Sequence, residues 1–247
     1  MIETPRPDSG GLQVVTRTAQ ILRLFDADRT TVRSALVEQE LGIGRTSAHR
    51  YLQSMATEGL LQRAGDGAYR LGPLLAGLGS AMLTRNRVID LGRPLIRELA
   101  DTSDQTAVLG IWTGTNAVAM LCEEPRGKTV HMTVRIGAPL PLDSAQGIAF
   151  LASQPDDSTL ERVLRGESDE ERRRLQQLVA DARALGYARS AAVLPGVGAV
   201  AVTVRDASGE AVATIATIAA TEMLTDARLE TLIPQLRTTA DQLGAQL

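Results

Sequence analysis

The segment from Ser34 to Glu58 constrains the fold of this chain most, because it carries the signals of two helices joined by a short glycine turn. The run "SALVEQEL" predicts a short helix that Ser34 caps and that Gly42 ends, since glycine readily adopts the left-handed conformation found at helix C-termini. A second helix is predicted from Arg45 or Thr46 to about Glu58. Its buried face is formed by apolar residues about one turn apart, namely Ala48, Leu52 and Met55. Together the two helices predict a helix-turn-helix.

A β-hairpin is predicted directly after the second helix. The Gly65-Asp66-Gly67 turn lies between two short apolar runs, which is typical of a hairpin and makes the helix-turn-helix a winged one. The periodicity of Val14–Phe25 predicts one further helix before the motif. The apolar run Pro73–Arg85 predicts a linker helix after it, and its apolar surface indicates a partner.

The start of the second helix carries a cluster of hydrogen-bond donors. In a winged helix this helix enters the major groove with its N-terminal end first, where it can reach phosphates and base edges. The exposed donors expected there are Arg45, Thr46, Ser47, His49 and Arg50. Arg63 and Arg70, on the two arms of the hairpin, are expected to reach flanking phosphates. Four arginines against two carboxylates give Gly44–Arg70 a net charge of +2, within a chain of net charge −3.

Other interpretations of this motif have to be weighed beside DNA binding. Helix-turn-helix folds also serve as protein–protein modules, and an arginine-bearing helix can simply be solvated. His49 has only one fellow histidine, His131, at a distant position, and no zinc-binding histidine pair occurs in the sequence. No nucleophile accompanies either histidine in a recognisable catalytic arrangement. We therefore expect no metal, no cofactor and no catalytic residues.

The composition restricts the compartment of the protein. Cys122 is the only cysteine, which excludes an intrachain disulfide and a cysteine-based metal cluster and fits a reducing cytoplasm. No apolar run reaches the roughly 20 residues that cross a bilayer. Residues 1–11 contain no apolar signal core and are expected to form a flexible arm. We expect a cytoplasmic protein without a membrane partner.

The second half of the chain changes from helical to strand-like periodicity after Thr102. Strands are expected at 108–112 and 118–121 around "TGTN", at 130–136, at 200–204 and at 212–218. Helices are expected at 88–101, 144–153, 157–185 with a break near Gly166, and 225–247 with Pro234 inside. Hairpin strands combined with helices predict an α+β domain on an antiparallel sheet.

Most of the sequence resembles the IclR family of bacterial transcription regulators. The similar segments, in family order, are "VVTRTAQIL", "LGIGRTSAHRYLQSMATEGLLQR", "AYRLGPLL", "LIRELADTSDQTAVLGI", "IGAPLPLDSAQGIAFLA", "LGYARS" and "SGEAVATIATIAATEMLT". The resemblance implies a DNA-binding domain at 12–72, a linker helix at 73–86, and an effector-binding and oligomerisation domain at 87–247 that resembles GAF and profilin-like folds. It also implies homodimers or tetramers that bind double-stranded operator DNA.

The resemblance also assigns individual residues. Arg17 matches the arginine of the first helix that approaches the DNA backbone, and Arg45, Thr46 and Ser47 match the residues at the start of the recognition helix. The effector-binding residues implied by the family are Met132, Leu140, Ala145, Gln146, Ser190, Ala199, Ala216 and Ile218. Three of these, at 199, 216 and 218, are apolar where the family usually has polar residues. We therefore expect an aromatic or medium-sized apolar acid as effector instead of a small keto acid.

Three classes of function follow from these observations. The expected one is a transcription regulator, acting as a repressor, whose DNA binding responds to a small organic acid or aromatic effector. A DNA-binding regulator without an effector is an alternative that the depleted polar residues support. An enzyme that uses the winged helix for oligomerisation is the other alternative. The sequence argues against the enzyme, because the second domain has one histidine, one cysteine and no assembled acid–base pair.

Overall fold

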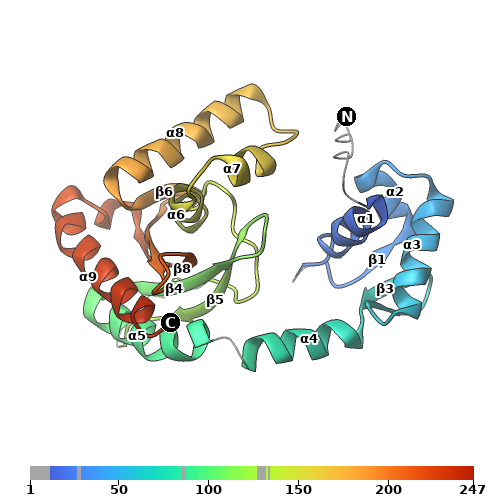
Figure 1. Ribbon diagram of the computed structural model, residues 1–247, viewed down its shortest axis with the longest axis horizontal. Helices are drawn as coiled ribbons and strands as arrows, with labels where there is room; N and C mark the ends of the chain where they lie inside the picture. Colours follow the sequence, from blue (N-terminus) through green and yellow to red (C-terminus); the bar gives the residue numbers. More distant parts are fainter. Residues whose placement is uncertain (1–11, 27–28, 85–86, 127–131, 133) are drawn as a thin grey trace. The chain divides into compact units, whose positions relative to one another are not determined.

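The computed structural model describes residues 12–26, 29–84, 87–126, 132 and 134–247 (Figure 1). The chain divides into two compact units, Met1–Arg85 and Asn86–Leu247. The arm expected at 1–11 lies outside the described residues, as do Val130 and His131. In the part of the chain that the structure describes, no helix has both the length and the hydropathy needed to cross a membrane.

The first unit contains four helices and a small sheet among its described residues. The elements are α1 (Gln13–Leu22), β1 (Val32–Arg33), α2 (Ser34–Leu41), α3 (Arg45–Thr57), β2 (Leu61–Arg63), β3 (Ala68–Leu71) and α4 (Pro73–Thr84). The strands form an antiparallel sheet in the order β1-β3-β2. The core of the unit includes the predicted buried face of α3, together with Ile21, Val37, Leu61 and Tyr69. A winged helix-turn-helix is therefore confirmed.

The glycine turn between α2 and α3 has the expected geometry. Gly42 follows α2 with a φ of 58°, in the left-handed region, and its amide donates to the carbonyl of Glu38. Ser34 does not cap α2 as predicted. It is the first residue of the helix, while Arg33 occupies the N-cap position without a side-chain hydrogen bond. Arg33 belongs to β1, so pairing of this strand with β3 fixes the chain as it enters α2.

The second unit is built on a five-stranded antiparallel sheet in the order β5-β4-β8-β7-β6. The strands are β4 (Thr106–Trp112), β5 (Ala117–Glu123), β6 (Ala188–Leu194), β7 (Val197–Arg205) and β8 (Ala211–Ala220). The helices are α5 (Arg87–Ser103), α6 (Ala145–Ser153), α7 (Ser158–Val163), α8 (Asp169–Leu185), the short 3-10 helix η1 (Thr221–Met223) and α9 (Asp226–Gly244). The α+β architecture predicted from the sequence is confirmed.

Helices cover both faces of this sheet (Figure 1). Helices α5 and α9 pack on one face, in a core that includes Leu109, Val202 and Ile215. Helices α6, α7 and α8 pack on the other face, in a core that includes Ala201 and Ala216. Because successive residues of a strand point to opposite faces, neighbours on β7 and β8 contribute alternately to the two cores.

The strand predicted at 130–136 is wrong for the residues that the structure describes. Met132, Val134 and Ile136 lie in an irregular segment and a turn, although their alternation is typical of a strand. An isolated bridge between Val118 and Pro139 joins this region to β5, and the amides of Gly137 and Leu140 donate to carbonyls of the same strand without forming a regular ladder. Proline has no backbone N–H to donate, so the segment around Pro139 cannot continue a regular ladder along the edge of the sheet.

One further element differs from the sequence-based expectations, and another agrees with them. Ser190 lies on β6, a strand that the sequence analysis did not predict, and its partner across the ladder is Ala199 of β7. The pairing shifts register after Ser190, which marks an irregularity in this edge strand. The break predicted near Gly166 is confirmed, because this glycine has a φ of 90° between α7 and α8.

Candidate nucleic-acid interface and ligand cavity

The N-terminal half of α3 presents the predicted donors to solvent. Arg45, Thr46, Ser47, His49 and Arg50 are all exposed, whereas the intervening Ala48 is buried against the rest of the unit. Gly44 occupies the N-cap position and forms no side-chain bond to the first turn. The first turn contains no acidic residue. Its amide groups and the positive end of the helix dipole therefore add to the donors of the side chains.

The hairpin places its two arginines on different faces. Arg70 on β3 lies opposite Gln62, and its guanidinium donates to the Gln62 Oε1 atom at 3.2 Å. Arg63 lies opposite Tyr69, one step further along the ladder. Directly paired residues share a face and neighbours alternate, so Arg63 and Arg70 point to opposite sides of the wing. Both side chains are exposed, and we expect them to reach different parts of a bound duplex.

Arg17 differs from the other predicted DNA contacts because it is half-buried. One of its nitrogens, Nη1, donates to the Gln20 Oε1 atom at 3.1 Å and to the backbone carbonyl of Leu41 at 3.2 Å. Leu41 is the last residue of α2, so the guanidinium satisfies a carbonyl at the C-terminus of that helix. Arg17 therefore ties α1 to the helix-turn-helix.

A cavity of about 360 Å³ in the second unit brings together all eight residues that the resemblance assigns to the effector. They come from the segment around residues 132–140, the start of α6 and the strands β6, β7 and β8. Six further residues complete the lining: Val134, Ser144, Val193, Leu194, Val197 and Gly198. The sequence analysis missed these six, although the apolar run of Val193 and Leu194 beside Ser190 was a visible signal. The lining is mostly apolar, as expected for a small-molecule site.

The N-terminus of α6 supplies backbone donors to this cavity. Ser144 caps the helix, and its hydroxyl accepts a hydrogen bond from the amide of Gly147 at 3.1 Å. Ala145 and Gln146 form the first turn and line the cavity, and amides in the first turn have no partner within the helix. Such a helix start favours a carboxylate through its N–H groups and its dipole.

The two polar side chains in the predicted set, Gln146 and Ser190, differ in whether they have a hydrogen-bond donor left for a ligand. The Nε2 atom of Gln146 donates to the backbone carbonyls of Val108 and Thr214, each at 3.2 Å. Both hydrogens of the amide are therefore used in bonds to the sheet. Gly110 makes room for this contact, because a Cβ atom there would lie 2.9 Å from Nε2. Ser190 accepts a hydrogen bond from the amide of Ala192 at 3.2 Å. The hydroxyl hydrogen of Ser190 can still be donated to a ligand.

An ion pair fixes the loop that precedes α6. Arg174 on α8 contacts the Oδ2 atom of Asp143 at 2.7 Å and a carboxylate oxygen of Glu171 at 2.7 Å. The hydrogen bond from Arg174 lowers the pKa of the Glu171 carboxyl below its ordinary value. Arg174 and Arg189 also line a cavity of about 220 Å³ that shares Ser190, Gly198 and Ala199 with the larger one. The fold thus brings Arg174 near the predicted site, and Arg189 directly precedes the site residue Ser190 in the sequence.

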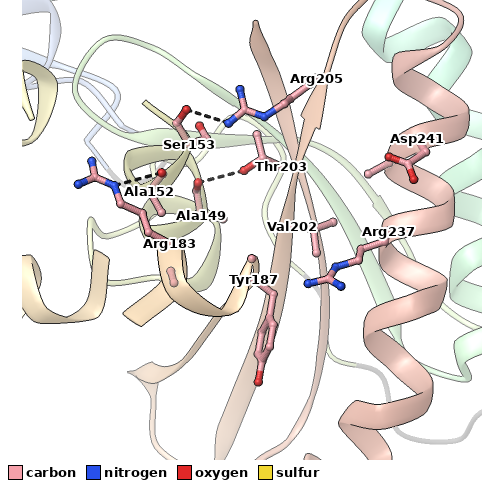
Figure 2. Close-up of a pocket in the computed structure, with 13 residues that line it drawn as sticks. Ala149, Ala152, Ser153, Arg183, Tyr187, Val202, Thr203, Arg205, Arg237 and Asp241 are labelled. Carbon is pink, nitrogen blue, oxygen red and sulfur yellow. Dashed lines mark hydrogen bonds between the residues drawn. The ribbon is translucent and has the colours of Figure 1, made fainter. Parts of the chain in front are cut away.

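A separate cavity of about 260 Å³ lies among α6, α8, α9 and β7 (Figure 2). Its three arginines donate to carbonyls near helix C-termini: Arg183 to Ala152, Arg205 to Ser153, and Arg237 to Leu185. These bonds satisfy acceptors that a helix end leaves without partners. Among the described residues, no group of three or more histidine, cysteine or acidic side chains is arranged to hold a metal ion.

Two protein-family models match the chain. The model described as "IclR helix-turn-helix domain" matches residues 14–65. The model described as "Bacterial transcriptional regulator IclR C-terminal" matches residues 80–245. The matched ranges correspond to the winged helix-turn-helix and to the unit that carries the cavity.

Individual relatives agree with these matches. The chain is 32% identical over 235 residues to the HTH-type transcriptional regulator BhcR of Paracoccus denitrificans, covering 90% of this chain and 82% of the relative. The crystal structure of an IclR family transcriptional regulator from Brucella abortus superposes with a TM-score of 0.81 at 23% identity, covering 97% and 94% of the two chains. An IclR homologue from Microbacterium hydrocarbonoxydans, complexed with 4-hydroxybenzoate, has a TM-score of 0.64 at 20% identity, covering 94% and 98%. At these identities the two structures support the fold alone.

Proposed function

The chain belongs to the IclR family of DNA-binding transcription regulators, and from this premise we propose that it is a repressor whose α3 helix reads an operator and whose C-terminal cavity binds an organic acid. It is a regulator and not an enzyme, so the enzyme alternative is wrong. In this proposal residues 12–72 bind DNA, 73–86 form a linker helix and 87–247 bind the effector. Its target is chromosomal DNA, which places its action in the bacterial cytoplasm.

The observation that carries the DNA-binding part is the run of five exposed donors on the N-terminal half of α3. Helix-start arginines can form two hydrogen bonds with a guanine, and the neighbouring serine and threonine hydroxyls can bond to phosphates or bases. The test is to select duplexes that bind the full-length protein from a random pool. We expect an enriched motif with two related half-sites separated by one helical turn or a multiple of it. Recovery of duplexes without a shared motif would contradict sequence-specific binding.

The effector that we propose is an aromatic or medium-sized apolar acid. The amides at the start of α6 and the Ser190 hydroxyl suit one carboxylate, and the apolar lining suits a ring or an alkyl body. A small dicarboxylate would need more donors than this lining offers, because a buried charge without partners costs several kcal/mol. The homologue from Microbacterium hydrocarbonoxydans that binds 4-hydroxybenzoate supports an acid of this kind.

A thermal-shift panel tests this choice of effector. The panel contains aromatic acids, medium-chain aliphatic acids, glyoxylate and pyruvate. A ligand at 100 times its Kd stabilises the folded protein by about 2.7 kcal/mol, which is visible as a rise in the melting temperature. We expect aromatic or apolar acids to give this rise. A rise with glyoxylate or pyruvate alone would contradict the argument from the lining, and it would point to Arg174 and Arg189 as the charge partners.

We further propose that the protein acts as a homodimer held together at α4, or as a tetramer made of two such dimers. Leu74, Leu78 and Met82 follow one another at intervals of one turn, and they are 43%, 57% and 53% exposed. No described residue of α4 is buried within the chain, so much of this apolar stripe is exposed to solvent. A second copy of α4 is the natural occupant, because a dimer reads a two-part operator and doubles the contacts of one winged helix.

A further inference from the structure

All four carbonyls at the C-terminal end of α6 have hydrogen-bond partners. A helix leaves its last four carbonyls without partners of its own, so these acceptors have to be satisfied from elsewhere. The pairs, each with its donor first, are Ser153 Oγ with Phe150, the Gln154 amide with Leu151, Arg183 Nε with Ala152 and Arg205 Nη2 with Ser153. The first two donors belong to the end of α6 itself, whereas the two arginines come from α8 and β7 (Figure 2).

Arg183 and Arg205 tie this end of α6 to two further points of the fold. The Nη1 atom of Arg183 lies 2.8 Å from the Oδ1 atom of Asp157, which precedes α7. The Nη1 atom of Arg205 donates to the carbonyl of Gly209 at 2.7 Å, in the turn between β7 and β8. The two guanidinium groups also place positive charge at the negative end of the helix dipole, where cations stabilise a helix.

Helix α8 holds α6 at both of its ends. Arg174 contacts Asp143 just before α6, and Arg183 contacts Ala152 near its last residue. Each contact joins residues that are 31 positions apart in the sequence, so the two segments advance in step from one contact to the other. With a rise of about 1.5 Å per residue, the two arginines are about 13 Å apart along α8. Helix α8 therefore supports α6 along its length.

We propose that Arg183 and Arg205 are positioning residues for the effector carboxylate, because they hold the far end of the helix whose first turn binds it. This inference rests on the proposed effector function of the cavity at the start of α6. Neither arginine lines that cavity, so both act through the helix. Helix α6 has only 9 residues, and a tilt at its C-terminal end would move the amides of Ala145 and Gln146 out of line with the ligand. The two positive charges also favour an anion at the opposite end, because they offset the negative end of the helix dipole.

The test compares a carboxylate with a neutral ligand of the same shape. Calorimetric titration measures the Kd of benzoate and of benzamide for the full-length wild type, for Arg183→Gln, for Arg205→Gln and for the double variant. Arg172→Gln is the matched control, because Arg172 also lies on α8, pairs with Glu161 at 2.7 Å and donates to the carbonyl of Leu164 at 3.0 Å. That carbonyl belongs to the end of α7, a helix that does not line the cavity.

We expect each single variant to bind benzoate about threefold more weakly than the wild type, and the double variant about tenfold more weakly. Benzamide has no charge to interact with the helix dipole, so its Kd should change by less than about twofold in every variant. Arg172→Gln should bind both ligands as the wild type does. Unchanged binding of benzoate by the double variant, or an equal loss for benzoate and benzamide, would overturn the positioning role and leave the effector site intact. A wild type that binds neither compound would overturn the ligand class, and the positioning role with it.

Discussion

The donors on α3 have distinct expected roles at the scale of single residues. Ala48 is buried and alternates with exposed neighbours, so the orientation of α3 follows from its packing and not from its charges. The sequence alone predicts this arrangement, because the apolar spacing of one helix reveals which side chains remain exposed. It does not predict the contact of Arg17 with the carbonyl of Leu41, since the two residues lie 24 positions apart.

Replacing Arg50 with alanine should weaken operator binding by about 1–3 kcal/mol if the guanidinium reads a base. If Arg50 contacts only phosphate, the loss should be similar on all duplexes, and the slope of log K against log salt should fall by about one. Fluorescence anisotropy at several salt concentrations separates the two cases, and Arg45→Ala is measured in the same way. Arg126→Ala, an exposed arginine of the other unit, is the matched control for charge. Unchanged affinity in both α3 variants would refute the assignment of this helix.

Gln146 should matter for stability as well as for ligand binding. Gln146→Met removes the hydrogen bonds that reach the carbonyls of Val108 and Thr214 inside the protein. We expect the free energy of unfolding to fall by about 1–3 kcal/mol, as measured by urea denaturation. Gln177→Met on the exposed surface of α8 is the control, and it should change stability by less than about 0.5 kcal/mol. Equal stability of the two variants would show that the contacts of Gln146 are dispensable.

At the scale of elements, the helices of this chain were easier to predict than the strands. Gly42 and Gly166 end or break helices where expected, because a left-handed φ is a local property of the sequence. The segment 130–136 has the alternation of a strand, yet its described residues Met132 and Val134 line a cavity instead. Strand β6 was not recognised, because its alanines and Ser190 lack the β-branched and aromatic side chains typical of strands.

The exposed stripe on α4 gives a prediction for one element. The double substitution Leu78→Glu with Met82→Glu places two charges on the proposed contact between copies, so the protein should become monomeric at micromolar concentration. Operator affinity should fall sharply with it, because one winged helix makes only half of the contacts. Multi-angle light scattering and anisotropy measure the two effects. Ala76→Glu lies on the opposite side of the same helix and should change neither. A monomeric wild type would exclude the proposed dimer.

At the scale of the whole molecule, the DNA-binding surface and the ligand cavity differ in how far the sequence predicts them. The winged helix is encoded in one continuous segment, so spacing and turn residues suffice to predict it. The cavity combines five separate parts of the chain, and periodicity alone does not group them. The resemblance to the IclR family selected the eight residues that the fold brings together. Arg174 was absent from that selection because its significance depends on a contact between separate elements.

The central claim is that occupation of the cavity changes operator affinity, and a linkage titration tests it most directly. Anisotropy measures the Kd for the selected operator with and without the acid that gives the largest melting shift. We predict a change of about 5- to 150-fold, and the operator must change the affinity for the acid by the same factor. Superimposable operator titrations with the acid saturating the protein would contradict the claim, because the ligand would then bind without regulating DNA binding.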